Sequence, residues 1–421
     1  MIEIPLWVVF LFGGAFLGLI LMIWSVKRRR QPRLELEAAD IEDLAPSIAG
    51  LTQGTLVRGN RIELVQNGAV WDRLFADLAA AKKTINFETF LCKEGELTRR
   101  MTGMLCRKAN EGVQVRLMMD GNGGKHYGDD DLKRMRDCGV RVAKYHPVRL
   151  SNLGILNNRD HRKITVIDGR LGYVGGHCLV DTWLGDAGDK QHFRDISARI
   201  EGPVVAQLQS AFAENWIEET GEVPGGTDFF PELEPAGDAG AHAVWISAAG
   251  SPSSVKLLHY LLIRAAKRRI TIQNPYFLPD PDARKALLDA VKRGVEVRVM
   301  IPASDASDMP VVQHASHHHY GTLLKGGVKL YDYHRTLLHQ KVITIDECWS
   351  AVGSTNFDDR SFEVNDEISL MIYDEAIARE LEQTFEDDLQ YATAPTLEEW
   401  KHRPALHKLL DFTAFVFNEQ L

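Results

Sequence analysis

The chain is poor in cysteine, has no excess of positive charge, and lacks a basic segment ahead of its one long apolar run. Its 421 residues include only five cysteines, Cys92, Cys106, Cys138, Cys178 and Cys348. Their number is odd, and their spacing matches neither a zinc motif nor a disulfide framework. We therefore expect reduced thiols and no metal centre built on cysteine.

The absence of excess positive charge limits the kind of partner that the protein can bind. There are 49 basic and 58 acidic residues, which gives a net charge of −9. Binding of nucleic acid rests on neutralising backbone phosphates, so this balance argues against nucleic acid. The length leaves room for two domains of ordinary size.

The long apolar run covers 4–26 and carries no charge. As a helix rising about 1.5 Å per residue, these 23 residues span roughly 34 Å, which is enough for a bilayer core. A cleavable signal peptide needs a basic start and a shorter apolar stretch. The run therefore predicts a transmembrane helix over 4–26.

Four basic residues, Lys27 to Arg30, immediately follow this predicted helix, whereas the only charged residue before it is Glu3. By the positive-inside rule, we expect a single-pass membrane protein with its body in the cytoplasm. The basic tether would run over 27–55. Gly14 and Gly18 have the spacing of a helix-pairing motif, which leaves a homodimer open.

An octapeptide pattern, His-x-Lys followed after four residues by Asp, occurs twice. The copies consist of His161, Lys163 and Asp168, and of His339, Lys341 and Asp346. Their offset of 178 residues also relates Gly175-Gly176 to Gly353-Ser354, seven positions past each Asp. Four positions held in register indicate an internal duplication.

The chemistry explains why these residue types occur together. A His and a Lys two positions apart on a strand project to the same face. One imidazole can attack phosphorus and form a phosphohistidine, while a second protonates the leaving alkoxide. Two lysines can neutralise the phosphate oxygens, so no metal or other cofactor is required. Each copy supplies half of this apparatus, which predicts one site where two halves meet.

The repeat extends beyond the motif and predicts the fold. Apolar strands alternate with amphipathic helices in each half, which is typical of an α/β fold. We expect two similar halves related by a pseudo-two-fold axis, each with a mixed, largely parallel sheet flanked by helices. The predicted boundaries are 56–220 for the first domain, 221–241 for a Gly- and Pro-rich linker, 242–395 for the second domain, and 396–421 for a C-terminal amphipathic helix.

Two helical segments invite further hypotheses. The apolar residues of 396–421 recur at helical spacing, so this helix packs on the body or lies at the bilayer surface. His317, His318 and His319 could suggest a metal, but three consecutive residues of a helix cannot all face one ion. We expect a solvated or partly packed helix there.

The stretches Gly353–Phe362, Asn365–Glu367 and Asn274–Asp280, together with the paired motifs, resemble the phospholipase D superfamily and, within it, bacterial cardiolipin synthases. The resemblance covers roughly 60–421. It implies a membrane phosphatidyltransferase that moves a phosphatidyl group from one phosphatidylglycerol to another through a phosphohistidine and releases glycerol. The alternatives are a phospholipase D-type hydrolase and a different transferase, such as one similar to phosphatidylserine synthase.

The resemblance also implies roles for residues. It makes His161 the nucleophile and His339 the acid and base. Asp195 and Glu367 would orient the histidines, because they occupy matching places in the repeat. The phosphate-binding candidates are Gly176, Cys178, Ser354 and Asn356.

One of these positions departs from the family, because Cys178 stands where Asn is usual. Either the first half-site holds phosphate less firmly, or His177 substitutes for the amide. Asp168 and Asp346 complete the set of catalytic candidates as general bases. Their position at the end of a strand, before Gly169 or Glu347, favours the alternative that each ties down a turn.

Overall fold

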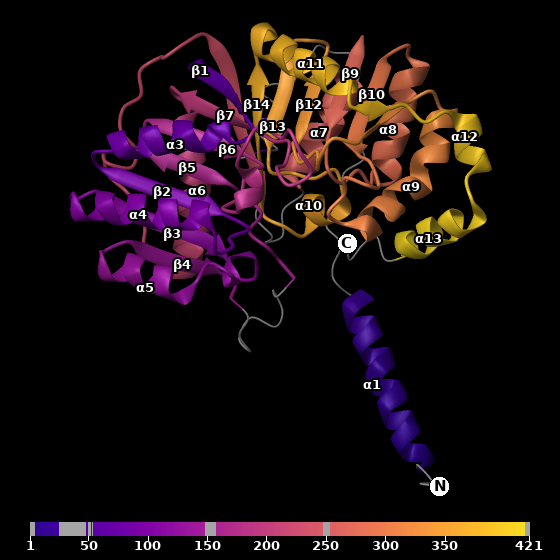
Figure 1. Ribbon diagram of the computed structural model, residues 1–421, viewed down its shortest axis with the longest axis horizontal. Helices are drawn as coiled ribbons and strands as arrows, with labels where there is room; N and C mark the ends of the chain where they lie inside the picture. Colours follow the sequence, from indigo (N-terminus) through magenta and orange to yellow (C-terminus); the bar gives the residue numbers. More distant parts are fainter. Residues whose placement is uncertain are drawn as a thin grey trace.

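The computed structural model describes residues 5–24, 48, 52, 54–147, 157–246 and 253–416. The body is built on one hydrogen-bonded sheet in the order β15-β11-β10-β9-β12-β13-β14-β8-β1-β7-β6-β5-β2-β3-β4. The two halves lie side by side, indigo to magenta for the first and orange to yellow for the second (Figure 1). β1 lies next to the central strand β8 and pairs with a strand of each half, β7 and β8.

The first half contains, in chain order, β1 (Val57–Gln66), α3 (Ala69–Ala80), β2 (Thr84–Thr89), α4 (Glu96–Asn110), β3 (Gln114–Asp120), η1 (Gly123–Lys125), α5 (Asp129–Asp137), β4 (Arg141–Tyr145), β5 (Ile164–Ile167), β6 (Leu171–Gly175), η3 (Asp181–Trp183), β7 (Ile196–Glu201) and α6 (Val205–Thr220).

The second half contains β8 (Ala239–Ile246), α7 (Ser254–Ala265), β9 (Arg269–Gln273), α8 (Pro281–Lys292), β10 (Glu296–Pro302), α9 (Pro310–Lys325), β11 (Lys329–Tyr333), β12 (Val342–Ile345), β13 (Trp349–Gly353), α10 (Asp359–Glu363), β14 (Glu367–Tyr373), α11 (Glu375–Leu389), β15 (Ala392–Thr393), α12 (Leu397–His402) and α13 (Ala405–Val416).

The sheet is mixed, as predicted, but it is not largely parallel. Among the strands that the structure describes, parallel pairing is confined to β2 with β3, β3 with β4, β9 with β10, and β10 with β11. In each case a helix provides the crossover that parallel strands need. The other pairings among the described strands are antiparallel, because short turns such as the one from β5 to β6 can join only antiparallel neighbours.

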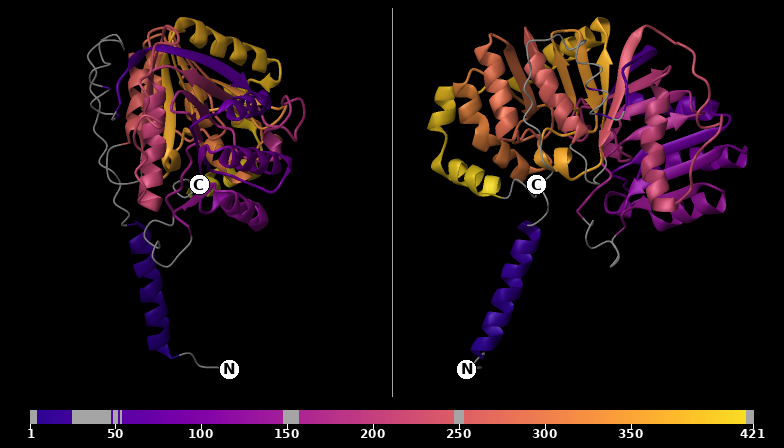
Figure 2. Two further views of the ribbon diagram at one scale, coloured as in Figure 1. Left: turned by 90° about the vertical axis from the view of Figure 1, so that its left-hand side faces the viewer. Right: turned by 180° about the vertical axis from the view of Figure 1, so that it is seen from behind.

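Helices cover both faces of the sheet, as the side view in Figure 2 shows. In β3, Leu117 and Met119 pack with α3, α4 and α5, whereas Met118 packs on Phe212 and Trp216 of α6. Alternate residues of a strand point to opposite faces, so a strand covered on both sides carries apolar residues at successive positions, as Leu117 to Met119 do.

The two halves share a hydrophobic core at their junction. Ile164 of β5 and Val205 of α6 belong to the same buried cluster as Val342 of β12, Ile368 of β14 and Leu381 of α11. All residues of the motif strands β5 and β12 are buried. The two motifs are thereby held against each other by core packing rather than by a flexible connection.

The predicted segments at the ends of the chain are only partly matched. The apolar run forms α1 (Leu6–Trp24), which lies apart from the body in Figure 1. Within the described residues, however, no helix is long and apolar enough to count as a bilayer span. Most of the predicted tether, 27–55, lies outside the described residues. The expected C-terminal helix is two helices, α12 and α13, and the linker ends where β8 begins at Ala239.

The expectation of reduced thiols is wrong for two cysteines. Cys106 of α4 and Cys138, directly after α5, form a disulfide, while Cys92, Cys178 and Cys348 are free. The pairing escaped the sequence argument because a spacing of 32 residues shows nothing about the packing of α4 on α5. Disulfides persist mainly in oxidising compartments, so this bond does not support a cytoplasmic body.

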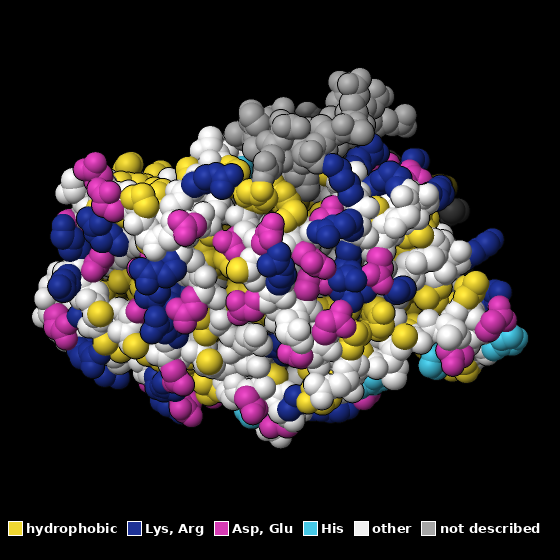
Figure 3. Space-filling view, turned by 90° about the horizontal axis from the view of Figure 1, so that it is seen from above, with side chains coloured by type: hydrophobic (Ala, Val, Ile, Leu, Met, Phe, Trp, Pro, Cys, Tyr) yellow, Lys and Arg dark blue, Asp and Glu magenta, His cyan; other side chains and the backbone are white. Residues whose placement is uncertain are grey.

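Figure 3 shows how charge is distributed on the face of the molecule that is seen from above. Basic and acidic side chains are interspersed there rather than gathered into a basic stripe (Figure 3).

Candidate active site

His161 and His339 lie where the two halves meet, each directly ahead of its motif strand. The backbone N–H of His161 donates to the carbonyl of Asp366 at 2.9 Å, and that of His339 donates to the carbonyl of Arg194 at 2.7 Å. Each histidine is therefore fixed to the half that it does not belong to. These two backbone hydrogen bonds place both histidines at the junction where the duplication predicts a single site.

The carboxylates cross the junction as well. Nδ1 of His161 lies 2.9 Å from Oε1 of Glu367, and Nδ1 of His339 lies 2.7 Å from Oδ2 of Asp195. Both carboxylates are fully buried. A carboxylate on Nδ1 fixes the tautomer and leaves Nε2 for chemistry.

The lysines lie beside these rings. Nζ of Lys341 is 2.8 Å from Nε2 of His339 and 2.7 Å from the carbonyl oxygen of His339. Nζ of Lys163 donates to the carbonyl of His161 at 2.6 Å. Burial lowers the pKa of Lys341 to about 7, although the charge of Asp195 opposes the shift. A bound phosphate would restore the ammonium form of Lys341, because a nearby anion favours the charged state.

Both histidines are held neutral in the free site. Burial, together with the charges of Lys163 and Lys341, lowers the pKa of His161 well below its usual value. Burial and the charge of Lys341 lower the pKa of His339 to about 4. A neutral imidazole offers an unprotonated Nε2, which is the form that attacks phosphorus.

The two carboxylates differ in charge state. Burial raises the pKa of Glu367 to about 7, which outweighs the lowering by Lys163 and by Ser354. Burial also acts to raise the pKa of Asp195, but the electrostatic interactions with His177 and His339, the hydrogen bond from His339 and the nearby Lys341 outweigh it, and the pKa falls below its usual value. Asp195 is therefore ionised at neutral pH, whereas Glu367 titrates there.

Different side chains hold the two carboxylates. The hydroxyl of Ser354 donates to Oε2 of Glu367, and the indole N–H of Trp183 donates to Oδ2 of Asp195 at 2.8 Å. Gly176 stands where the repeat has Ser354, and a Cβ at Gly176 would lie only 2.5 Å from Oδ2 of Asp195. Ser354 thus holds the carboxylate of Glu367, and Gly176 leaves room for that of Asp195.

Aromatic residues that the sequence argument missed line the site. Trp183 packs edge-on against the ring of His339 at 5.0 Å between centroids, and Phe90 packs similarly against His161 at 4.9 Å. Phe90 directly follows β2 and Trp183 ends η3, and neither belongs to the repeat pattern. The sequence signal for Trp183 is its place between Cys178 and Asp195.

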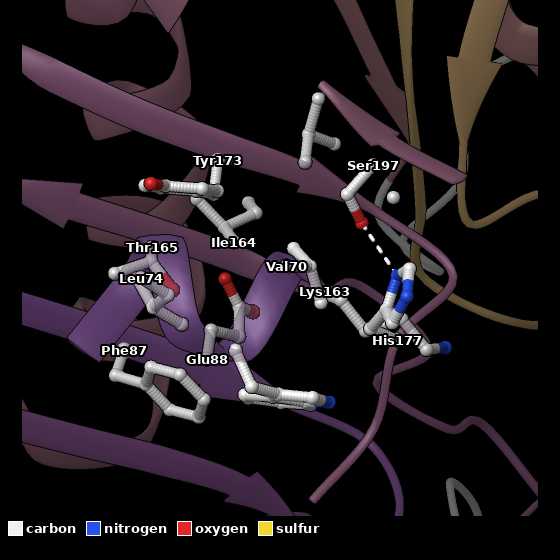
Figure 4. Close-up of a pocket in the computed structure, with 13 residues that line it drawn as sticks. Val70, Leu74, Phe87, Glu88, Lys163, Ile164, Thr165, Tyr173, His177 and Ser197 are labelled. Atoms are coloured by element: carbon white, nitrogen blue, oxygen red, sulfur yellow. Dashed lines mark hydrogen bonds between the residues drawn. The ribbon is translucent and has the colours of Figure 1, made fainter. Parts of the chain in front are cut away.

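His177 does not replace the missing amide. Its Nδ1 lies 2.8 Å from the hydroxyl of Ser197 and its Nε2 2.9 Å from the carbonyl of Asn67, so both ring nitrogens are occupied. Figure 4 shows the first of these bonds, next to Lys163 at the edge of a cavity of about 30 Å³. Such a cavity has room for about one water molecule.

Cys178 and Asn356 differ in what they contact. The thiol of Cys178 is buried in an apolar cluster and makes only a weak contact, 3.8 Å to the carbonyl of Gly176. Oδ1 of Asn356 is buried and has no hydrogen-bond partner among the described residues. The second half-site therefore keeps an amide with unused hydrogen-bonding capacity, and the first does not.

Asp168 and Asp346 lie away from the site. The carboxylate of Asp168 accepts hydrogen bonds from the backbone N–H groups of Lys82, Lys83 and Thr84. Asp346 does the same for 267–269. Seven residues of extended chain, spanning about 23 Å, separate each Asp from its His. These contacts favour the alternative that each Asp ties down a turn over a role as a general base.

Comparisons with known proteins agree with this geometry. A family model described as "Cardiolipin synthase, PLD-like domain" matches 74–216 and 261–389. The chain is 33% identical over 372 residues to the major cardiolipin synthase ClsA of Bacillus subtilis, covering 87% of this chain and 76% of that protein. It is 35% identical over 352 residues to cardiolipin synthase A of Pseudomonas putida F1, covering 83% and 73%.

Solved structures with low sequence identity share the fold. Phosphatidylserine synthase of Haemophilus influenzae aligns with a TM-score of 0.68 at 12% identity, covering 86% of this chain and 95% of that one. Polyphosphate kinase of Porphyromonas gingivalis aligns with a TM-score of 0.55 at 13% identity, covering 92% and 57%. At such identities the likeness concerns the fold alone.

Proposed function

The chain belongs to the cardiolipin synthases of the phospholipase D superfamily, and from that premise we propose that it joins two phosphatidylglycerol molecules into cardiolipin and releases glycerol. It is a phosphatidyltransferase. The observation that carries the proposal is the crossed pair of contacts, His161 with Glu367 and His339 with Asp195. Two oriented imidazoles and two lysines at one junction are what a double displacement at phosphorus needs.

In the first step, Nε2 of His161 attacks the phosphorus of the donor phosphatidylglycerol. The P–N bond forms as the P–O bond to the headgroup glycerol breaks. His339, which acquires its proton when the anionic substrate enters, protonates the leaving oxygen. Glycerol departs, and the phosphatidyl group stays on His161.

In the second step, a headgroup hydroxyl of the acceptor phosphatidylglycerol attacks the phosphohistidine. His339, now neutral, takes the hydroxyl proton, the P–N bond breaks, and cardiolipin leaves. Lys163 and Lys341 stabilise the charge on the phosphate oxygens in both steps. His161 is regenerated, so the cycle closes without a cofactor.

The unequal carboxylates support this assignment of roles. An ionised Asp195 stabilises the imidazolium that His339 must form twice per cycle. Glu367, with a pKa raised to about 7, gives weaker support to a charged His161. A nucleophile should remain neutral until it attacks, which suits His161.

The deciding experiment is incubation of the purified protein with phosphatidylglycerol, with cardiolipin, phosphatidic acid and free glycerol resolved. We expect cardiolipin and glycerol in equal amounts. Phosphatidic acid as the main product would show that water is the acceptor, as in the hydrolase alternative. Quenching with a denaturant at neutral to alkaline pH, where the P–N bond survives, should leave the label of a phosphate-labelled lipid on His161, and a label on His339 would reverse the roles.

We also propose that the enzyme works at the bacterial inner membrane, attached through 4–26. A second contact is available on α13, where Leu406, Leu409, Leu410 and Phe412 are between 41% and 64% exposed. Such a face at the bilayer surface would keep the site near its lipid substrates. A homodimer through Gly14 and Gly18 stays a prediction, which cysteine cross-linking at Gly14 tests.

A reporter fused to the C-terminus would show on which side of the membrane the body lies. The basic residues from Lys27 to Arg30 lead us to expect it in the cytoplasm. A reporter on the outer side would overturn the charge argument, and it would give the Cys106–Cys138 disulfide the oxidising surroundings that such bonds need.

A further inference from the structure

Two helices outside the catalytic junction bring a set of metal-ligand side chains together. His314 and His317 are three residues apart on α9, and His407 and Asp411 are four residues apart on α13. Both spacings place a pair of side chains on one face of a helix. α13 packs against α9 through these faces.

The donor atoms are close enough to share one ion. Nδ1 of His314 lies 2.8 Å from Oδ1 of Asp411, and Nδ1 of His317 lies 4.0 Å from the same oxygen. One donor atom from each of these three residues lies within 4.8 Å of the others. Zinc–ligand bonds of about 2.1 Å in a tetrahedron put donors about 3.4 Å apart, so small side-chain rotations suffice.

The surroundings favour an ion over a simple ion pair. Asp411 is 2% exposed, and Nε2 of His317 is buried without a hydrogen-bond partner among the described residues. The pair of His314 with Asp411 uses neither nitrogen of His317, and Nδ1 of His317 is the one that faces Oδ1 of Asp411. The ring of His407 lies 6.3 Å from that of His314 between centroids, within reach of a fourth ligand position.

The charged group facing the cluster most directly is Arg403, which also lies on the C-terminal segment. Its guanidinium donates to Oδ2 of Asp411 at 2.8 Å and leaves Oδ1 directed at the histidines. A ligating carboxylate commonly has its second oxygen held by such a donor. Arg284 lies farther off, with a contact to Nε2 of His319 at 3.0 Å.

We propose that His314, His317 and Asp411 bind one divalent transition-metal ion, with Zn²⁺ as the best match, and that His407 or a water completes a tetrahedral shell. Imidazole and carboxylate donors suit this class of ion. The ion fastens α13 to α9 and has no part in phosphoryl transfer. None of the residues of the His-x-Lys motifs lies on these helices, so the catalytic proposal and this one can fail separately.

The site is tested by binding of Co²⁺, whose visible absorption is intense in tetrahedral surroundings, to the full chain without an affinity tag and after dialysis against a chelator. We expect one equivalent to bind, with bands that disappear when Zn²⁺ is added. His317→Ala and Asp411→Asn should each weaken binding at least tenfold. His402→Ala is the matched control, because His402 is exposed and contacts only the carbonyl of Glu398.

Trp400 provides a second readout, since its ring lies 5.2 Å from that of His317. Its fluorescence should change on addition of Zn²⁺ to the wild type and to His402→Ala, but not to Asp411→Asn. Absence of stoichiometric Co²⁺ binding in the folded wild type overturns the proposal. Equal loss of binding in His402→Ala and His317→Ala also overturns it, because the ion would then lie elsewhere.

Discussion

Oδ2 of Asp195 lies 2.7 Å from Nδ1 of His339, although the two residues belong to different halves of a duplicated chain. The mirror contact of Glu367 with His161 has the same form. Neither half therefore contains a complete histidine–carboxylate pair. A single copy of the repeat would orient neither imidazole, which gives a physical reason for the two halves to remain in one chain.

Asp195→Asn should lower kcat for cardiolipin formation by about 10²- to 10⁴-fold. The amide keeps the shape of the side chain but removes the charge that supports the His339 imidazolium in both steps. The measurement is the initial rate with phosphatidylglycerol in mixed micelles, with thermal unfolding as the control for folding. A loss below threefold would remove Asp195 from the proposed mechanism.

Glu367→Gln should be less damaging, and its effect should depend on pH. The pKa of Glu367 is raised to about 7, so below pH 7 the wild-type side chain is mostly protonated and resembles the neutral amide. Above pH 7 the wild type gains a charge that the variant lacks. The ratio of wild-type to variant kcat should therefore rise as pH increases from 6 to 8. A ratio that is constant over this range would contradict a titrating Glu367.

Asn356→Ala should reduce kcat about 10- to 100-fold, whereas Cys178→Ala should cost less than about threefold. A hydrogen bond to a charged phosphate contributes about 1.5–3 kcal/mol. The amide Nδ2–H of Asn356 can donate to a phosphate oxygen, whereas the thiol of Cys178 is a weak donor that lies 3.8 Å from the carbonyl of Gly176. Equal losses in the two variants would show that the half-sites bind phosphate alike.

Asp168→Ala should lower stability and leave kcat of the folded enzyme within about twofold. Its partly buried carboxylate accepts hydrogen bonds from three backbone N–H groups, and losing a hydrogen-bonded group of this kind costs about 1–3 kcal/mol. Asp346→Ala is the matched change in the second half. Thermal unfolding and kcat, measured on the same preparation, separate the two effects. An unchanged melting temperature with a lost kcat would return these residues to the catalytic set.

The sequence was sufficient for the features that the duplication encodes. Register between the copies predicted two similar halves, one junction and the pairing of carboxylates with histidines, because residues matched by an internal repeat occupy matching places in space. It was insufficient where contacts depend on packing between distant segments. The Cys106–Cys138 disulfide and the Trp183 bond to Asp195 are of this kind.

The mistaken expectation of a largely parallel sheet has a different origin. Apolar strands buried on both faces look alike whether their neighbours are parallel or antiparallel. The structure distinguishes them through the connections, since the short turns after β5 and β12 impose antiparallel pairs. The length of these turns, rather than the composition of the strands, was the informative signal.

The exposed face of α13 leads to the last prediction, made with Leu406→Ser combined with Leu409→Ser. These side chains are 64% and 58% exposed, so their replacement should leave the fold intact. Burying each in a bilayer surface contributes about 1 kcal/mol, and losing both should lower kcat/KM on phosphatidylglycerol vesicles about 10- to 30-fold.

Turnover on the same lipid in detergent micelles should be unchanged, because the junction of the halves is untouched. Val223→Ser is the matched control, since Val223 is 72% exposed and lies in the linker. It should behave as wild type on both substrates. Equal losses on vesicles and micelles would mean that α13 supports the fold rather than the membrane contact, and no loss on vesicles would leave 4–26 as the sole proposed attachment.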